Sequence, residues 1–317
     1  LVERLVDLAA IELGTSPDAL RAKNFIPKAQ MPFKQAMGLT YDSGDFNATM
    51  QLAMKEADWA GFPQRKAAAK TRGKLRGIGM AYYVEACGGA PDEKATLYVN
   101  EDETVTLTIG NQSNGQGHET AYAQLITEQL GVPLDRIKVV QGDTAKIATG
   151  NGTGGSRALP VGGVATTNAV NDVIAKGKEI AADALEAAKA DIEFADGQFR
   201  IAGTDRTIGI FEVAKRAKAK KVDLTGLGDF MPPAATFPNG CHICEVEIEP
   251  ETGRVGIVKL TMVDDFGRII NPMLLAGQVH GGVAQGLGQA LMEGAVYDRE
   301  SGQLLTGSLM DYALPRA

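Results

Sequence analysis

The sequence predicts a globular protein of about two domains in which helices alternate with antiparallel strands. Three observations lead to this prediction. The chain has 317 residues, whereas one domain has roughly 100 to 200 residues. Its composition, 44% hydrophobic and 22% charged, is that of a folded soluble protein. Segments of helical periodicity are interleaved with segments in which apolar and polar residues alternate.

Charge and cysteine content exclude several functional classes. A net charge of -7 argues against an extended basic surface for nucleic acid or anionic lipid. No apolar run approaches the roughly 18 residues that a membrane helix needs. Three cysteines cannot form a disulfide framework in a chain of this size. Because the N-terminus also lacks a signal-peptide pattern, we expect a cytoplasmic protein.

The N-terminal region is predicted to be helical. Residues 1–13 place their apolar side chains on one face, and a second short helix begins with Ser16 as its cap and Pro17 in its first turn. A third helix is expected at residues 46–60. The basic residues between 66 and 76 show little periodicity, and we therefore expect a solvated linker there.

From Leu75 onward, strands with one buried face alternate with helices. The expected strands cover residues 95–99, 105–109, 136–141, 192–194, 199–201, 244–248 and 255–263. The expected helices cover residues 118–130, 162–190, 209–220 and 272–293. Asp196-Gly197 is a strong signal for a two-residue hairpin turn. Both halves thus run hairpin, glycine-rich loop, helix, which is either a weak internal repeat or a coincidence.

The first glycine-rich loop contains Gly115, Gln116, Gly117 and His118. Its glycines allow backbone N–H groups to approach an anion, and a helix that begins near His118 adds its positive end. Gln116 offers a neutral amide that can both donate and accept. The loop is therefore a candidate anion site, and the alternative is an ordinary strand-to-helix turn.

The second glycine-rich loop covers residues 149–157 and also precedes a helix. Its glycine amides, the hydroxyls of Thr153 and Ser156 and the charge of Arg157 are the groups of a phosphate cradle. The loop lacks both the Walker ending and the dinucleotide fingerprint, which disfavours a standard ATP or NAD site. A flexible loop without a ligand is the alternative.

The last helix carries glycine and glutamine on adjacent stripes. They are Gly277, Gly281, Gly288, Gln278, Gln285 and Gln289. Because glycine costs about 1 kcal/mol in a helix interior, we expect something to approach Gly281 closely. That neighbour is either another helix or a cofactor.

Other candidate residues are interpreted as structural. Cys241 and Cys244 would point to opposite faces of a strand, which disfavours a shared metal. Asp264 and Asp265 end a strand, and Asn271 caps the following helix. No Ser-His-Asp order with suitable spacing is present in the sequence.

Taken in order, these segments resemble the molybdenum-binding large subunit of the xanthine dehydrogenase, aldehyde oxidase and aerobic carbon monoxide dehydrogenase family. The matching stretches are residues 115–120, 141–144, 152–157, 237–240, 271–272 and 277–282. The resemblance implies an α+β fold with two tandem molybdopterin-binding domains, mixed sheets and flanking helices. We expect an N-terminal helical segment and linker at 1–73, the first domain at 74–230 and a truncated second domain at 231–317.

The same resemblance implies a molybdopterin cofactor carrying molybdenum, in bacteria usually the cytosine dinucleotide form, between the two domains. The implied cofactor-binding residues are Gly115, Gln116, Gly117, His118, Thr153, Gly154, Gly155, Ser156, Arg157 and Gln278. Gln116 would face the oxo ligand of molybdenum, and no side chain would bind the metal directly. Electrons would pass to FAD and [2Fe-2S] centres on partner subunits.

Two elements of the family are not found in this sequence. By this resemblance, we expect the upstream loops to precede Leu1 and the glutamate that acts as base to follow Ala317. We therefore expect a segment of a longer chain or one piece of a split subunit, and a non-catalytic cofactor-holding module is the alternative. The substrate could be an aldehyde, an aromatic N-heterocycle or carbon monoxide, with carbon monoxide least favoured.

The missing base leads to a first prediction. Hydroxylation releases a proton that a base must accept, and in the family that this sequence resembles the base is a carboxylate. Glu119 is already accounted for at the start of a helix. The 317-residue chain, loaded with cofactor and given an artificial electron acceptor, should not oxidise an aldehyde or a heterocycle. Activity should appear when the flanking segments are restored, and steady turnover without them would contradict the prediction.

Overall fold

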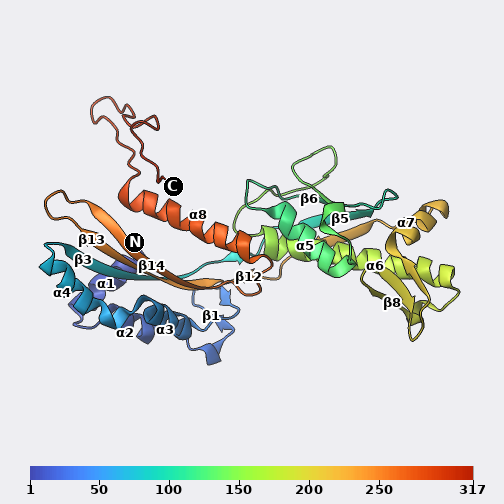
Figure 1. Ribbon diagram of the computed structural model, residues 1–317, viewed down its shortest axis with the longest axis horizontal. Coiled ribbons are helices and arrows are strands. Elements are labelled where there is room, and N and C mark those ends of the chain that lie inside the picture. The colour runs from blue at the N-terminus through green and yellow to red at the C-terminus, as the bar shows by residue number, and fades with distance from the viewer. Residues whose placement is uncertain (317) are drawn as a thin grey trace. The chain divides into compact units, whose positions relative to one another are not determined.

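The computed structural model describes residues 1–316, and the chain divides into two compact units (Figure 1). The central unit contains residues 85–237. The terminal unit contains residues 1–84 together with the chain from Pro238 onward. Each unit has a hydrophobic core of its own.

A mixed four-stranded sheet organises the central unit. In spatial order its strands are β11 (Gly226–Phe230), β5 (Glu93–Val99), β6 (Val105–Ile109) and β7 (Ile137–Val140). Strands β5 and β6 form the expected antiparallel hairpin, whereas β6 and β7 are parallel and are connected through α5 (His118–Leu130). Parallel strands end at the same edge of a sheet, so the loops that follow β6 and β7 start beside each other.

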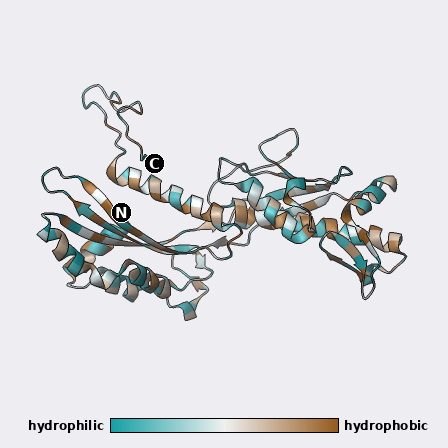
Figure 2. Cartoon of the chain, viewed as in Figure 1, coloured by the Kyte–Doolittle hydropathy of each residue, from teal (hydrophilic) through white to brown (hydrophobic). Residues whose placement is uncertain are grey.

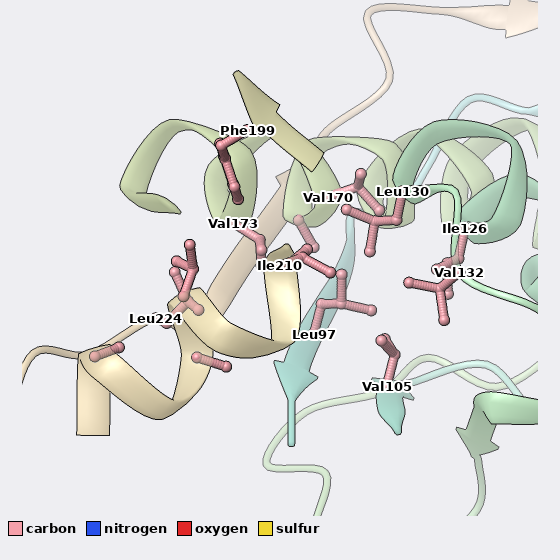
Figure 3. Packing of buried hydrophobic residues seen from close by; sticks show 14 of the residues in the cluster. Leu97, Val105, Ile126, Leu130, Val132, Val170, Val173, Phe199, Ile210 and Leu224 are labelled. Atoms are coloured by element: carbon pink, nitrogen blue, oxygen red, sulfur yellow. The ribbon is translucent and has the colours of Figure 1, made fainter. Parts of the chain in front are cut away.

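Two helices cover one face of this sheet. Helix α6 (Val164–Leu185) packs on β11 and β5, while α5 packs on β7 and on α6. A π-helical turn at Ala158–Gly163 leads from the second glycine-rich loop into α6. Figure 3 shows the resulting core, in which Leu97 and Val105 of the sheet are fully buried with Leu130 of α5.

A smaller antiparallel sheet completes the central unit. Its strands are β8 (Ile192–Ala195), β9 (Gln198–Ile201) and β10 (Thr207–Gly209), and helix α7 (Ile210–Ala219) follows. The expected turn at Asp196-Gly197 is confirmed, because φ is 48° and 74° at these residues, the left-handed pair that a type I′ turn requires. Two short strands, β4 (Cys87–Gly88) and β12 (Ala235–Thr236), pair with each other.

The terminal unit is built on a three-stranded antiparallel sheet of order β14-β13-β3. These strands are β3 (Leu75–Val84), β13 (Asn239–Ile248) and β14 (Val255–Asp265). The other N-terminal elements are α1 (Val2–Glu12), α2 (Pro17–Asn24), β1 (Phe33–Lys34), β2 (Thr40–Tyr41), α3 (Phe46–Ala57) and α4 (Phe62–Thr71). Helix α3 packs on β13 and β14, where Met50 joins Cys241 and Ile243 in the core.

Helices α1 and α2 protect the outer edge of the terminal sheet. Arg21, which is buried, donates from Nη2 to the carbonyl oxygen of Met80 in β3 at 3.0 Å. Glu3 accepts the N–H of Tyr82 on the same strand at 2.6 Å. These side chains satisfy backbone groups that an edge strand otherwise exposes. Ser16 caps α2 as expected, since its Oγ accepts the N–H of Ala19.

The structure corrects the expected linker, because residues 62–71 form helix α4. The basic residues of this region pair with acidic residues at alternate positions of β13. Glu245, which is 3% exposed, accepts hydrogen bonds from Nε of Arg65 at 3.0 Å and of Arg76 at 2.7 Å. Arg72 pairs with Glu247 at 2.6 Å. These partners are remote in sequence, so local periodicity could not reveal them.

The structure also divides the segment expected to form the first domain. Strand β3 falls inside the range 74–230, yet it pairs along its whole length with β13 of the terminal unit. The two strands are antiparallel and hydrogen-bonded, with Leu75 opposite Ile248 at one end and Val84 opposite Asn239 at the other. This long-range pairing draws β3 into the terminal unit. The N-terminal helices and β3 therefore form one unit with the C-terminal strands.

Helix α8 (Pro272–Leu291) begins at Asn271, whose Oδ1 accepts the N–H of Leu274 at 2.9 Å. Glycine and glutamine interrupt its apolar positions, as its mixed colours in Figure 2 show. A Cβ added at Gly277 or Gly281 would meet no atom within 4 Å. Close packing by another helix at Gly281 is thus not found among residues 1–316, and a cofactor there stays a prediction.

None of the helices described in residues 1–316 combines the length and the apolar character that crossing a membrane requires.

The close packing of α6 on β11 leads to a second prediction. A Cβ at Gly228 would overlap the carbonyl oxygen of Ala165 in α6. Gly228→Ala should therefore destabilise the central unit by about 1 to 3 kcal/mol through overpacking, measured by urea denaturation. Gly79→Ala is the matched control, because a Cβ at this strand position meets nothing within 4 Å. Equal stability of the two variants would contradict the packing argument.

Candidate functional site

The two glycine-rich loops of the central unit lie against each other. A Cβ at Gly110 would sit 2.6 Å from Cα of Gly150, and a Cβ at Gly150 would sit 2.5 Å from the carbonyl oxygen of Gly110. Thr153 Oγ1 accepts the N–H of Gln112 at 3.1 Å and donates to the carbonyl oxygen of Gln112 at 2.6 Å. Residues 110–112 at the base of the first loop are therefore in direct contact with residues 149–153 of the second loop.

A buried ion pair holds the second loop. Arg157 is 4% exposed and Glu93, at the start of β5, is 1% exposed. Arg157 Nη1 donates to Glu93 Oε2 at 2.8 Å and to the carbonyl oxygen of Gly152 at 3.2 Å. Its Nη2 donates to the carbonyl oxygens of Pro91 at 3.1 Å and Asp92 at 2.7 Å. Four bonds to protein acceptors thus engage both terminal nitrogens of the guanidinium.

This geometry corrects the role expected for Arg157. The sequence suggested that its charge would pair with an anionic ligand, but Glu93 already neutralises that charge inside the protein. Arg157 instead fixes the backbone of the loop. The sequence did contain a signal for Glu93, because this acidic residue shares the buried alternation of β5 with Ala95 and Leu97.

The base of the first loop is attached to the same network through Asn111, which is fully buried. Its Nδ2 donates to the hydroxyl of Tyr122 at 2.7 Å and lies 3.4 Å from Glu93 Oε2. Gln141 Nε2 donates to the carbonyl oxygen of Asn111 at 2.9 Å and to its Oδ1 at 2.7 Å. The Tyr122 hydroxyl donates in turn to the carbonyl oxygen of Ala158 at 2.7 Å. Sequence reasoning missed Asn111 and Tyr122, whose partners are 11 to 36 residues distant.

His118 begins α5 and lies within this buried layer. It is 7% exposed, its ring centroid is 5.9 Å from that of Tyr122, and its Nδ1 is 3.4 Å from Gln141 Nε2. Burial lowers the pKa of His118 below the ordinary value of 6.5. The imidazole is therefore neutral near pH 7 and can accept a hydrogen bond at one nitrogen while it donates from the other.

The exposed side of the two loops is formed by backbone and neutral groups. Gly115, Gly154, Gly155 and Ser156 are exposed, and a Cβ at any of these three glycines would meet nothing within 4 Å. In residues 1–316 the N–H groups of residues 154–156 have no protein acceptor. Gly117, with φ of 78°, directly precedes α5. Free amides in the second loop and the N-terminus of α5 after the first loop are each suited to bind an anionic ligand.

Gln116 is half-buried between the glycines of the first loop. Its Oε1 accepts the N–H of Asn114 at 2.5 Å, which leaves the amide nitrogen of Gln116 for a donor role. Gln141 Oε1, at the base of the same loop, is buried without a partner among the described residues. An unpartnered buried acceptor is costly, so an external hydrogen-bond donor would stabilise this position.

The loops thus fit a large cofactor that is anionic and rich in hydrogen-bonding groups, such as a molybdopterin. Donors are free on the exposed side, and the carboxylate of Glu93 is neutralised. A hollow of about 460 Å³ adjoins the second loop and is lined by Asp92, Glu93, Lys94 and residues 148–151. Over residues 1–316 no group of three or more His, Cys, Asp or Glu side chains is placed to hold a metal ion.

The remaining predicted site residue, Gln278, belongs to the terminal unit. It lies on α8 and borders a cavity of about 410 Å³ together with Tyr83, His242 and Asp264. His242 Nε2 is 2.8 Å from Asp264 Oδ1, which also accepts the hydroxyl of Tyr83 at 3.0 Å. Asp264 therefore has a defined structural role, as expected.

The cysteines of β13 face opposite sides of the strand, as the alternation predicted. Cys241 is fully buried in the core, while Cys244 is partly exposed. Burial raises the pKa of Cys241 to about 12, so its thiol stays protonated at neutral pH.

Comparison with known proteins identifies the family. A family model for the molybdopterin cofactor-binding domain matches residues 52–317. This chain belongs to that family. The assignment confirms the resemblance found in the sequence, and it shows that molybdopterin is the cofactor for which this kind of domain is built.

Two curated relatives of this molybdopterin-binding chain illustrate the range of the family. The carbon monoxide dehydrogenase large chain of Hydrogenophaga pseudoflava is 33% identical over 337 residues, covering 100% of this chain and 42% of that protein. The nicotine 6-hydroxylase large subunit of Paenarthrobacter nicotinovorans is also 33% identical, covering 99% of this chain and 41% of that protein. The chain therefore spans about 42% of the length of such relatives.

Solved structures confirm the expected α+β fold. A Cu,Mo-CO dehydrogenase in the carbon monoxide reduced state matches with a TM-score of 0.91 and 33% identity, covering 100% of this chain and 42% of that chain. Quinoline 2-oxidoreductase from Pseudomonas putida 86 matches with a TM-score of 0.90 and 33% identity, covering 99% and 42%. Proteins named for different substrates thus share this fold to the same degree.

The buried state of His118 leads to a third prediction. Because the pKa of His118 is lowered in the folded protein, the unfolded chain binds more protons below pH 6.5, and stability falls as the pH drops. The melting temperature should therefore fall between pH 7.5 and 5.5, and His118→Gln should reduce that fall. His280→Gln, at an exposed position of α8, is the control. The same pH dependence in His118→Gln and in the parent would show that His118 is not the group responsible.

Proposed function

We propose that this chain is the cofactor-holding part of a molybdenum hydroxylase, an oxidoreductase that inserts oxygen derived from water at a carbon centre. One observation carries the proposal. The two glycine-rich loops, which carry neutral donors, are joined by Thr153 and anchored by the Arg157–Glu93 pair. The family assignment and the names of the relatives support the same reading.

Residues of this chain would bind and orient the cofactor. The amides of Gly154, Gly155 and Ser156, with the Ser156 hydroxyl, would hold its anionic part, because uncharged donors bind an anion without a buried positive charge. Thr153, whose hydroxyl proton is donated to the carbonyl oxygen of Gln112, would keep the two loops together. Gly115 and Gly117 would let the first loop approach closely. Gln116 would donate from its amide nitrogen to an acceptor on the cofactor. When bound, the molybdopterin cofactor supplies the redox chemistry.

His118 and Gln141 would complete the floor of the site. A neutral His118 adds no charge, so the anionic cofactor is held without a change of protonation near pH 7. The unpartnered Oε1 of Gln141 would accept a hydrogen bond when the cofactor or an ordered water reaches it. Gln278 of α8 would contribute its amide to the same cofactor.

The form of the cofactor, the partner subunits, the cellular location and the substrate are also proposals. We infer the cytosine dinucleotide form of the cofactor, FAD and [2Fe-2S] centres on partner subunits, and a cytoplasmic location. The candidate substrates are carbon monoxide, aldehydes and aromatic N-heterocycles. Relatives named for carbon monoxide and for nicotine are equally similar at 33% identity, so identity does not rank these substrates.

The fourth prediction tests cofactor binding directly. Arg157→Ala leaves the buried carboxylate of Glu93 unpaired, which costs roughly 3 to 5 kcal/mol for a buried pair, and releases the second loop. The full protein carrying this substitution should retain clearly less molybdenum and less nucleotide than the parent. Molybdenum is measured by mass spectrometry, and the nucleotide is identified by chromatography after release.

Arg65→Ala is the control for this experiment, because Arg65 also pairs with a buried glutamate but lies in the terminal unit. It should keep its cofactor. Equal cofactor content in Arg157→Ala and the parent would refute the role of the second loop. A parent protein free of molybdenum and nucleotide, purified from cells that make the cofactor, would refute the proposed function itself.

A further inference from the structure

A single carboxylate serves both glycine-rich loops. Glu93 Oε2 accepts Nη1 of Arg157 at 2.8 Å, which anchors the second loop, and lies 3.4 Å from Nδ2 of Asn111, which belongs to the first loop. Its Oε1 lies where the loops touch, because a Cβ at Gly110 would be 2.6 Å from it. Glu93 lies outside the motifs of both loops, and its only signal in the sequence is its place in the buried alternation of β5.

The position requires a negative charge as well as a hydrogen-bond acceptor. Arg157 is 4% exposed and cannot lose its proton in a protein. Its other acceptors are backbone carbonyl oxygens, which carry no charge. Glutamine at position 93 would keep the shape of the side chain but leave a buried cation without a counterion.

The position also requires the length of glutamate. The carboxylate must reach Arg157 and Asn111 while it lies against the contact between Gly110 and Gly150. Asn111 in turn holds Gln141, whose amide lies 3.4 Å from His118. A continuous chain of contacts therefore runs from Glu93 to the start of α5, where the first loop ends.

We propose that Glu93 is a positioning residue that holds both cofactor loops in one arrangement, so that neither loop keeps its binding geometry when the other is released. This inference rests on the proposed function. Glu93 acts through Arg157 and Asn111 and need not touch the cofactor. Outer-shell residues that orient metal ligands typically change metal affinity or activity 10- to 100-fold when replaced, and we expect an effect of the same order for Glu93.

The chain offers a matched control in Glu245. This glutamate is 3% exposed and accepts hydrogen bonds from two arginines, Arg65 and Arg76, but it lies in β13 of the terminal unit. Glu245→Gln therefore creates the same kind of buried charge defect at a position outside the cofactor loops. A general loss of stability would affect both variants, whereas a loss of loop positioning would affect only Glu93→Gln.

The fifth prediction compares Glu93→Gln with Glu245→Gln in the full protein. Both should lower the melting temperature. Glu93→Gln should release molybdenum and nucleotide roughly tenfold faster or more after dilution, while Glu245→Gln should match the parent. Hydrogen exchange, measured on protein without cofactor, should become faster in both 110–118 and 149–157 for Glu93→Gln.

Each outcome decides the proposal. Unchanged cofactor release in Glu93→Gln, or faster exchange in 149–157 without any change in 110–118, would overturn it. If Glu93→Gln does not fold, Glu93→Asp is used, which keeps the charge but shortens the reach by one methylene. It should fold and show intermediate release, and behaviour equal to the parent would overturn the proposal. Because exchange is measured without cofactor, this arm remains decisive if the proposed function itself fails.

Discussion

The pairing of Glu93 with Arg157 is the interaction on which the candidate site depends. Burying two charges is costly, and such a pair is stabilised by good geometry and by further hydrogen bonds to the charged groups. Here both terminal nitrogens of Arg157 also donate to the carbonyl oxygens of Pro91, Asp92 and Gly152, while its Nε is buried without a partner among the described residues. The pair therefore connects the start of β5 with Gly152 and with the C-terminal end of the second loop, between which the exposed amides of that loop lie.

The sheet of the central unit explains why this pair can also organise the first loop. Strands β6 and β7 are parallel neighbours, so the segments that follow them leave from the same edge. Helix α5 connects these strands and begins at that edge, which adds a helix N-terminus to the loops. Asn111 and Gln141, one from each segment, are bonded to each other there. The topology thus brings together the groups that we propose to hold the cofactor.

The terminal unit also contains a buried glutamate that is paired with arginine. Its buried Glu245 joins α4 to β13 and β3 through Arg65 and Arg76, as Glu93 joins β5 to the loops. Burial opposes ionisation of Glu245, yet hydrogen bonds from the two arginines outweigh it and lower its pKa. In this unit the charged network stabilises the packing of helices on a sheet. In the central unit the Glu93–Arg157 pair anchors the loops that we propose to bind the cofactor.

The sequence by itself determined the elements whose signals are local. Ser16 and Asn271 cap helices as predicted, Asp196-Gly197 turns the expected hairpin, and both glycine-rich loops precede the helical segments they indicated. Only the tertiary structure decided which residues meet. Arg157 forms an ion pair with Glu93, which is 64 residues away in the sequence. Arg65 of α4 bonds to Glu245 of β13, about 180 residues away. Strand β3 pairs with β13, which lies outside the domain expected for β3. The physical reason is that helix caps, turns and periodicity depend on neighbours along the chain, whereas buried charge pairs and strand partners depend on packing between segments that are remote in sequence.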